Sequence, residues 1–340
     1  MSSWSRFSPS ELDLAEEQLK LFSGIEITTR IIPVGNGQHL YSSICGDPSN
    51  PPLILLHGFC GAGMIFYKIL SQLASLYYIY LVDLLGMGRS SRPNFTATSI
   101  SDSEDFFVEP LENYRRELGL EKFILIGHSF GGYIAGCYAA KYPQYIQSLI
   151  FLSPVGISEQ PPGYNYLYTL ESKDWKYRWA MKFLVFFWTR NVTPTSIMRK
   201  AGPFSGKLLE LYSIRKISKI PQSELRSLER YLEQINLLPA SGELALLYLC
   251  YPGAWAKMPL CKRVNNLKIP IGFLFGDKDW VSTRGAEQLR EQHPSSIRIK
   301  TISDSGHHLY WDNPRETIQQ ITEMLSEFER ISKLEHTCEA

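Results

Sequence analysis

The sequence predicts an α/β fold in which a mostly parallel β-sheet is flanked by helices and carries an inserted helical cap. Short apolar runs alternate with helical segments over residues 25–157, and the same alternation returns over residues 263–335. The stretch between them, residues 158–262, lacks strand signals and is rich in aromatic side chains. Because short buried strands that alternate with helices are typical of parallel sheets, the outer stretches predict one core and the middle stretch its cap.

The composition is that of an ordinary globular protein with almost no net charge. The chain has 340 residues, 44% of them hydrophobic, with 35 Lys and Arg against 34 Asp and Glu. This balance argues against nucleic acid as a partner. Aromatic residues make up 13% of the chain, which indicates an apolar substrate or a lipid interface.

The sequence contains no pattern that predicts export or membrane insertion. Residues 1–7 lack an apolar signal-peptide core, and the most apolar run, residues 183–188, is far too short to span a bilayer. The six cysteines show neither metal-ligand nor disulfide-framework spacing, which favours a reducing compartment. We therefore expect an intracellular protein, cytoplasmic or peripheral on a membrane.

Residues 1–24 predict an N-terminal helical segment. A cap-like start at Ser8-Pro9-Ser10 precedes a helix over residues 11–22. One face of this helix is apolar and consists of Leu12, Ala15, Leu19 and Phe22, with Trp4 and Phe7 before the helix. This face either packs on the domain or, together with the two aromatic residues, anchors the protein on a lipid surface.

The core is expected to begin with an antiparallel strand pair and to continue with parallel strands. The pair spans residues 25–34 and 39–44. The later strands are expected at residues 52–59, 77–82, 123–126, 148–152, 269–276 and 297–302. Helices are expected at residues 66–76, 106–118 and 133–142. A further helix follows the strand at residues 269–276 and ends at residue 292, and the C-terminal helix begins after Asp312-Asn313-Pro314. The polar, acidic stretch 99–105 is expected to be a surface loop.

The expected cap carries aromatic and basic side chains in alternation. Its aromatic residues include Tyr164, Tyr166, Tyr168, Trp175, Tyr177, Trp179, Phe183, Phe186, Phe187 and Trp188. Its basic residues include Lys173, Lys176, Arg178, Lys182 and Arg190. The basic residues either form a solvated helix face or contact phospholipid head groups.

The strand at residues 123–126 runs into the pattern Gly-x-Ser-x-Gly, which points to a serine nucleophile. Strand, sharp turn and helix form the structural context of a nucleophile elbow. Gly127 and Gly131 leave room for a turn that is too tight for side chains, and Ser129 lies at its tip. The N–H of Phe130 then points at the developing oxyanion.

A serine hydroxyl needs a general base, and the base needs an acid that orients it. In the order Ser, Asp or Glu, His, the acid and the base lie on loops after later strands. Asp277 and Asp279 follow one strand; we prefer Asp279 because it lies deeper in the loop. His307 and His308 follow the next strand, and we prefer His307, directly after a glycine.

A second oxyanion donor is expected in the loop after the first parallel strand. The strand ends in His57 and Gly58 and runs into a glycine-rich loop at residues 59–63, and the N–H of Phe59 is the candidate. His57 itself is expected to make structural hydrogen bonds within the loop. No metal or cofactor site emerges from the sequence.

These motifs resemble the α/β-hydrolase superfamily. The elbow at residues 127–132, the loop at residues 83–93 and His57-Gly58-Phe59 are general features of that superfamily. More discriminating stretches are residues 199–204 (Arg-Lys-Ala-Gly-Pro-Phe), 241–243 (Ser-Gly-Glu), 253–260 (Gly-Ala-Trp-Ala-Lys-Met-Pro-Leu) and 306–314 (Gly-His-His-Leu-Tyr-Trp-Asp-Asn-Pro). Together they resemble the branch that contains the N-acyl-phospholipid lysophospholipase, the lipid-droplet lipase co-activator and the fungal cardiolipin-specific deacylase.

The resemblance implies an α/β-hydrolase fold of the eight-stranded type and a phospholipid or lysophospholipid acyl ester as substrate, without a cofactor. It also implies that a membrane or lipid-droplet surface is a partner. Two alternatives remain. His307-x4-Asp312 fits a pattern linked in this branch to acyl-CoA-dependent acylation of lysophosphatidic acid, although Asp312 or Asn313 also suits a helix N-cap. The co-activator member lacks the nucleophile, so a non-catalytic regulator of another lipase is the other alternative; the presence of Ser129 favours an enzyme.

Overall fold

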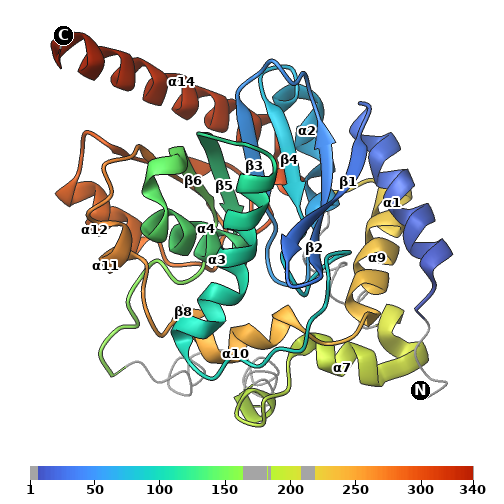
Figure 1. Ribbon diagram of the computed structural model, residues 1–340. Helices are drawn as coiled ribbons and strands as arrows, with labels where there is room; N and C mark the ends of the chain where they lie inside the picture. Colours follow the sequence, from blue (N-terminus) through green and yellow to red (C-terminus); the bar gives the residue numbers. More distant parts are fainter. Residues whose placement is uncertain (1–6, 164–181, 183–184, 208–218, 340) are drawn as a thin grey trace.

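The computed structural model describes residues 7–163, 182, 185–207 and 219–339 (Figure 1). Several residues singled out in the sequence lie outside this part. They are Trp4, Tyr164, Tyr166, Tyr168, Lys173, Trp175, Lys176, Tyr177, Arg178, Trp179 and Phe183. In the described part, no helix combines the length and the apolar character needed to cross a membrane.

One eight-stranded sheet forms the centre of the molecule, as the resemblance implied. Its strands are β1 (Thr28–Gly35), β2 (Gln38–Cys45), β3 (Pro52–Leu56), β4 (Tyr78–Val82), β5 (Phe123–His128), β6 (Ile146–Leu152), β9 (Ile271–Gly276) and β10 (Ile297–Ile302). The spatial order is β1-β2-β4-β3-β5-β6-β9-β10. The β1–β2 and β2–β4 pairs are antiparallel, and all other neighbours are parallel. The expected fold class is confirmed.

Helices cover both faces of the sheet and create two hydrophobic cores. One face carries α3 (Ile100–Glu117), α4 (Phe130–Lys141), α11 (Cys261–Val264) and α12 (Arg284–Gln292), and the other carries α1 (Pro9–Ser23), α2 (Tyr67–Leu73), α9 (Gln222–Leu237), α13 (Leu309–Asp312) and α14 (Pro314–Glu339). The strands supply both cores in alternation: on β3, Ile54 and Leu56 point to the first core and Leu53 and Leu55 to the second. This alternation explains why the parallel strands appear in the sequence as uninterrupted apolar runs.

The segment between β6 and β9 leaves the sheet and includes the expected helices. Its further elements are α7 (Pro194–Ala201), η3 (Gly202–Phe204), η4 (Gly242–Leu244) and α10 (Ala245–Leu249). The expectation that strands are absent here is wrong, because β7 (Cys250–Tyr251) and β8 (Trp255–Ala256) form an antiparallel pair. Each strand has only two residues, which is too short for a recognisable period. The cap boundaries at residues 158 and 262 stay a prediction.

Two helices begin before their expected first residues. The stretch 99–105 is not a loop: Ser99 caps α3, its hydroxyl accepts from the Asp102 N–H, and the Asp102 side chain accepts from the Ser99 N–H. This capping box makes the polar stretch the first turn of the helix. The α4 helix begins at Phe130, directly after Ser129, instead of at residue 133.

The N-terminal helix packs on the domain. Leu12, Ala15 and Leu19 are buried in the second core, where α1 lies against α9 and α2. These three side chains are therefore not available to a lipid surface, and only Phe22 of the expected face is exposed. Phe7 is partly buried against the same core.

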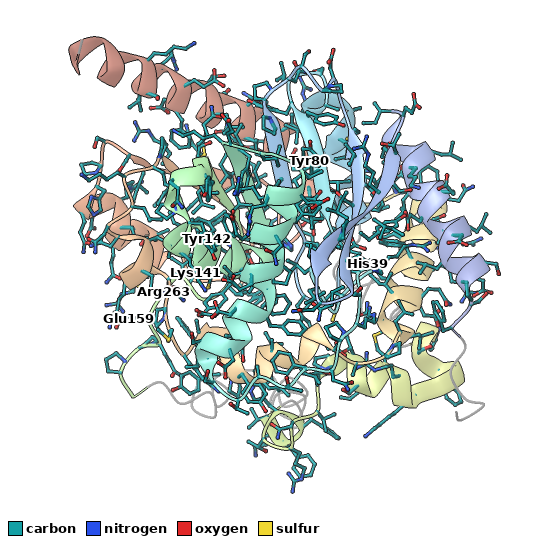
Figure 2. All side chains as sticks on the ribbon, viewed as in Figure 1. His39, Tyr80, Lys141, Tyr142, Glu159 and Arg263 are labelled. Carbon is teal, nitrogen blue, oxygen red and sulfur yellow. The ribbon has the colours of Figure 1, made fainter. Side chains whose placement is uncertain are left out.

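A buried carboxylate connects α3, α4 and α11. Glu104 of α3 accepts a hydrogen bond from the Tyr133 hydroxyl at 2.6 Å and from the Arg263 guanidinium at 2.6 Å. Lys141 and Tyr142, at the end of α4, lie near Arg263 (Figure 2) and contact Asp105 and Glu109 of α3. The contacts of Glu104 hold α11 against α3 and α4.

Candidate active site

The nucleophile elbow has the crowded geometry expected from its glycines. Ser129 has φ 53° and ψ −116°, in a region that side-chain-bearing residues rarely adopt. A Cβ atom at Gly127 would lie 2.4 Å from the carbonyl oxygen of Gly131, and one at Gly131 would lie 2.3 Å from the carbonyl oxygen of His57. The Ser129 N–H donates to the Leu152 carbonyl at 3.0 Å, which attaches the turn to β6.

The structure brings Ser129, His307 and Asp279 together although they are far apart in the chain. His307 Nε2 lies 2.9 Å from Ser129 Oγ, and His307 Nδ1 lies 3.1 Å from Asp279 Oδ1. The three residues follow the carboxyl ends of β5, β10 and β9. Since these strands are parallel, their carboxyl ends meet at one edge of the sheet.

The Asp279 carboxyl is suited to hold the histidine ring. Its side chain is almost fully buried, and the Val281 N–H donates to Oδ1 at 3.2 Å. Burial raises its pKa, but the hydrogen bond and the charge of His307 lower it by more, so the pKa lies below the usual value of an aspartate. Asp279 is therefore ionised at neutral pH and accepts a hydrogen bond from the Nδ1–H of His307.

The two competing residues have other contacts. Asp277 is exposed, and its carboxylate accepts the Ser305 N–H at 2.8 Å, so it stabilises the turn before His307. His308 Nδ1 lies 3.0 Å from the Tyr310 hydroxyl, and its ring packs against Trp311. The structure thus places Asp279 and His307, the two preferred residues, in contact with each other.

The two oxyanion candidates lie on the two chain segments next to the serine, the start of α4 and the loop after β3. Phe130 is the first residue of α4, where an N–H has no acceptor within its own helix. Phe59 lies in the loop after β3, inside the turn in which the Gly61 N–H donates to the Gly58 carbonyl at 3.0 Å. A Cβ atom at Gly58 would lie 3.0 Å from the Cβ of Ser129, so the loop passes directly beside the nucleophile.

Structural hydrogen bonds hold this loop, as expected for His57. The Leu84 N–H donates to His57 Nε2 at 3.0 Å, so His57 Nδ1 carries the proton and donates to the Gly58 carbonyl at 2.8 Å. Burial lowers the pKa of His57 to about 4, which keeps the ring neutral. At the other end of the loop, Asp83 Oδ1 accepts the Gly63 N–H at 2.6 Å.

Two residues of the site were missed in the sequence. His128 is buried, and its Nε2 donates to the His307 carbonyl at 3.0 Å, while its Nδ1 lies 3.3 Å from the Tyr310 hydroxyl. Trp280 is 55% exposed, and its ring lies 5.0 Å from the His307 ring, centre to centre. His128 lies within the elbow motif, but its partner Tyr310 lies 182 positions away and could not be foreseen.

An apolar cavity adjoins the oxyanion loop. Its volume is about 460 Å³, and its apolar walls are formed by Phe59, Ile65, Ile197, Met198, Leu232 and Trp311. Polar side chains in the wall bond to other protein groups: the Trp311 indole donates to the Ile65 carbonyl at 2.8 Å, and Asn236 to the Cys60 carbonyl at 2.8 Å. The cavity therefore suits an apolar group such as an acyl chain.

The His307-x4-Asp312 pattern has a structural explanation. Asp312 Oδ2 accepts the Gly306 N–H at 2.8 Å, which fixes the backbone before His307. Burial raises the pKa of Asp312. The N-cap of α14 is Asn313, whose side-chain oxygen accepts the Glu316 N–H at 3.2 Å.

Comparison with known proteins places this geometry in a family. The model of the α/β hydrolase fold family matches residues 51–314. The 1-acylglycerol-3-phosphate O-acyltransferase ABHD5 of Homo sapiens is 32% identical over 328 residues, which cover 93% of this chain and 90% of that protein. The 1-acylglycerol-3-phosphate O-acyltransferase of Arabidopsis thaliana is 32% identical over 270 residues. This chain spans 65% and 64% of the lengths of the matched Oryza sativa and Arabidopsis thaliana proteins.

Solved structures agree in fold at low sequence identity. Carboxylesterase CesB from Bacillus subtilis has a TM-score of 0.65 at 17% identity, covering 93% of this chain and 97% of that one. A membrane phospholipase A described as a bacterial virulence factor has a TM-score of 0.65 at 19% identity, covering 94% and 92%. At these identities the likeness establishes the fold alone. Together with the family match and the ABHD5 relatives, it shows that the chain belongs to the α/β-hydrolase family, in the branch that contains ABHD5.

Proposed function

We propose that this protein is a serine hydrolase that cleaves acyl esters of phospholipids or lysophospholipids through an acyl-enzyme. The observation that carries the proposal is the position of the His307 ring, with Nε2 2.9 Å from Ser129 Oγ and Nδ1 3.1 Å from Asp279 Oδ1. A hydroxyl, an imidazole and a buried carboxylate in this order are the elements of acyl transfer by a serine nucleophile.

The geometry supports the following sequence of steps. His307 Nε2 takes the proton of Ser129 as Oγ attacks the ester carbonyl, and Asp279 stabilises the imidazolium. The oxyanion accepts hydrogen bonds from the N–H groups of Phe59 and Phe130. His307 then gives its proton to the leaving alcohol oxygen, which leaves the acyl group on Ser129. Water, deprotonated by the same imidazole, attacks this ester, and the fatty acid departs as the serine recovers its proton.

The proposed substrate class rests on the cavity beside the oxyanion loop. Its apolar walls lie next to Phe59 and Gly58, so an acyl chain in the cavity has its carbonyl end near Ser129. Burial of the chain provides binding free energy of about 25 cal/mol per Å² of apolar area. A phospholipid or lysophospholipid supplies such a chain on an ester bond.

A second candidate is transfer of an acyl group from a thioester such as acyl-CoA to lysophosphatidic acid. The names of the ABHD5 and plant relatives favour it. The same acyl-enzyme serves both reactions, because only the acceptor that attacks the Ser129 ester differs. A non-catalytic role in regulating another lipase is the third candidate, and the contacts of Ser129 with His307 argue against it.

Product analysis distinguishes these candidates. The purified protein is incubated with lysophosphatidylcholine or phosphatidylcholine, and separately with acyl-CoA and lysophosphatidic acid, while fatty acid release and phosphatidic acid formation are measured. We expect fatty acid release, absent in Ser129→Ala and retained in Ser75→Ala, which changes a surface hydroxyl at the end of α2. Phosphatidic acid as the only Ser129-dependent product would favour the second candidate, and no Ser129-dependent product would favour the third.

A further inference from the structure

Cys60, in the loop that carries the proposed oxyanion donor Phe59, has a strained backbone. Its φ is 62°, in the left-handed region that a residue with a Cβ atom adopts at a cost. Cys60 directly follows Phe59, so the conformation of this residue determines where the loop runs past Ser129. Such a conformation persists only where surrounding contacts hold it.

Besides the turn bond between Gly61 and Gly58, a contact from the segment inserted between β6 and β9 holds this residue. Asn236, in the last turn of α9, donates through Nδ2 to the Cys60 carbonyl at 2.8 Å and to the Leu232 carbonyl at 2.8 Å. The Asn236 side chain is buried and is separated from Cys60 by 176 positions in the sequence. This hydrogen bond restrains the peptide that follows the strained residue.

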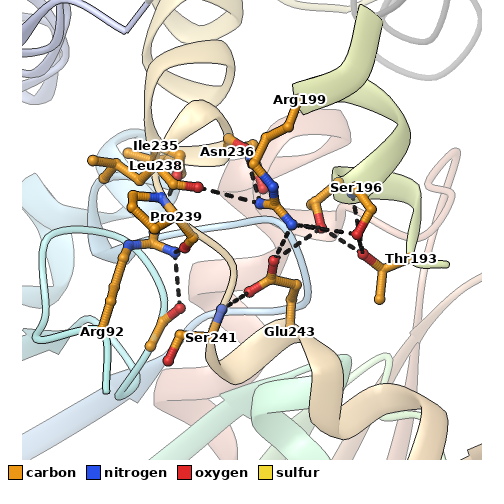
Figure 3. Close-up of polar contacts among 12 residues, drawn as sticks. Arg92, Thr193, Ser196, Arg199, Ile235, Asn236, Leu238, Pro239, Ser241 and Glu243 are labelled. Atoms are coloured by element: carbon orange, nitrogen blue, oxygen red, sulfur yellow. Dashed lines mark hydrogen bonds and ion pairs between the residues drawn. The ribbon is translucent and has the colours of Figure 1, made fainter. Parts of the chain in front are cut away.

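Two arginines from different parts of the fold in turn hold the end of α9 (Figure 3). Arg92, from the loop after β4, donates to the carbonyls of Ile235 at 3.0 Å and Pro239 at 2.8 Å. Arg199, from α7, donates to the carbonyls of Asn236 at 3.2 Å and Leu238 at 3.3 Å. The last carbonyls of a helix lack partners within it and carry partial negative charge, so two cations stabilise this end.

The arginine pair is itself fixed to the rest of the molecule. Arg199 forms an ion pair with Glu243, whose other oxygen accepts the Ser241 N–H at 2.9 Å. Arg92 also donates to the carbonyls of Gly86 and Gly88, both at 3.0 Å. Asn236 is therefore presented to Cys60 from a helix end that is bound on both sides.

We propose that Asn236 is a positioning residue for the oxyanion hole: it acts through the Cys60 carbonyl and keeps the N–H of Phe59 directed at the reacting carbonyl. The inference rests on the proposed hydrolase function and adds a residue of the segment between β6 and β9 to its machinery. The alternative is that Asn236 serves only to terminate α9 through its bond to Leu232.

Two variants separate these possibilities. Asn236→Leu has a similar shape and suits the apolar cavity, but it loses both hydrogen bonds. Asn236→Ser keeps a hydroxyl that can bond to the carbonyl four residues earlier, Leu232, but it is too short to reach Cys60. The matched control is Asn113→Leu, which removes an asparagine that donates to the Val34 carbonyl at 2.9 Å on the edge strand β1.

Both Asn236 variants should lower kcat for ester hydrolysis by roughly 10- to 100-fold, with KM within about twofold of the wild type, because the loss falls on the transition state. Amide hydrogen exchange of residues 57–63 should accelerate in both variants and stay unchanged in Asn113→Leu. If Asn236→Leu does not fold, Asn236→Ser alone decides. The inference would be overturned if both Asn236 variants had the kcat of the control and the same exchange rate at residues 57–63. It would also be overturned if kcat fell only in Asn236→Leu.

The two readouts also separate this inference from the proposed function. A wild-type protein that hydrolyses no ester would refute the proposed function, while exchange of residues 57–63 still reports whether Asn236 holds the loop. Exchange that accelerates only in the Asn236 variants supports the positioning contact in that case, and unchanged exchange contradicts it.

Discussion

At the scale of single residues, the two nitrogens of His307 have different tasks. Asp279 is ionised and can only accept a hydrogen bond, so it selects the tautomer with the proton on Nδ1. Nε2 is then left as the acceptor for the Ser129 hydroxyl. Asp277, two positions earlier, has no part in this arrangement because its carboxylate bonds to the Ser305 N–H.

Asparagine substitutions test this assignment. Asp279→Asn should lower kcat by about four orders of magnitude, because the amide stabilises the wrong tautomer of His307 and cannot balance the imidazolium charge. Asp277→Asn should change kcat by less than roughly tenfold, since it affects only a turn. Steady-state kinetics on one lysophospholipid compares the two variants. A larger loss in Asp277→Asn would overturn the choice of acid.

The residues of the site differ in how far the sequence reveals them. Ser129 lies in a short motif in which a side chain at either flanking glycine would clash with the backbone. The order of acid and base along the chain then indicates Asp279 and His307. Asn236 carries no local signal, because it is one polar residue in an amphipathic helix whose partner Cys60 is 176 positions away. Contacts of this range depend on the packing of the folded chain.

At the scale of structural elements, two buried neutral histidines lie at the carboxyl ends of neighbouring strands: His57 directly follows β3, and His128 is the last residue of β5. Burial lowers the pKa of His57 to about 4 and that of His128 to about 3, from 6.5. Below pH 6.5 the unfolded chain therefore binds protons that the folded chain does not, and stability falls as the pH is lowered. The buried Asp83, with a pKa raised to about 7, contributes in the opposite direction.

Substitution of His128 isolates its contribution to the pH dependence of the free energy of unfolding. His128→Asn keeps a donor for the His307 carbonyl but does not titrate. Between pH 6.0 and pH 4.0, the free energy of unfolding of the wild type should decrease more steeply than that of the variant, by about 1.4 kcal/mol per pH unit. Urea unfolding at a series of pH values measures both slopes. Parallel slopes would show that His128 is not held neutral by burial.

The N-terminal helix offers a matched test of its packing. Leu12 is 2% exposed in the second core, and Leu14 on the same helix is 64% exposed. Leu12→Ala should lower the free energy of unfolding by about 2–5 kcal/mol through lost burial and a residual cavity. Leu14→Ala should change it by less than about 0.5 kcal/mol. Equal effects in urea unfolding would mean that α1 is not packed as described.

The element boundaries show where sequence patterns lose information. The polar composition of residues 99–105 favours a surface loop in the sequence. In the structure these residues form the start of α3, because Ser99 and Asp102 form a capping box. The β7–β8 pair is two residues long on each side and is defined by tertiary pairing, not by a period. The parallel strands, in contrast, were readable because both of their faces are buried.

At the scale of the whole molecule, α7, α10 and β8 of the inserted segment lie along one end (Figure 1). Large apolar side chains on this segment are exposed, including Phe186 and Phe204, the latter at 69%. Trp188, in contrast, is partly buried against the first core. If the protein binds lipid surfaces as the sequence resemblance implies, we expect the contact from the exposed residues of the inserted segment and not from the buried face of α1.

Liposome flotation tests this surface. The double variant Phe186→Ser and Phe204→Ser should reduce binding to liposomes without lowering the melting temperature, since both side chains are exposed. The control is Ile31→Ser on the edge strand β1, which removes an exposed apolar side chain outside the inserted segment. Equal binding by wild type, double variant and control would exclude Phe186 and Phe204 as lipid contacts.

The central claim is that Ser129 carries the acyl group during turnover, and mass spectrometry of the acid-quenched enzyme tests it most directly. The protein is mixed with a lysophospholipid, quenched within milliseconds to seconds, and digested. The account predicts a peptide containing Ser129 whose mass is increased by one acyl group, accumulating before free fatty acid and missing in Ser129→Ala. Fatty acid release without acylated Ser129 at any quench time, or equal release by Ser129→Ala, would contradict it.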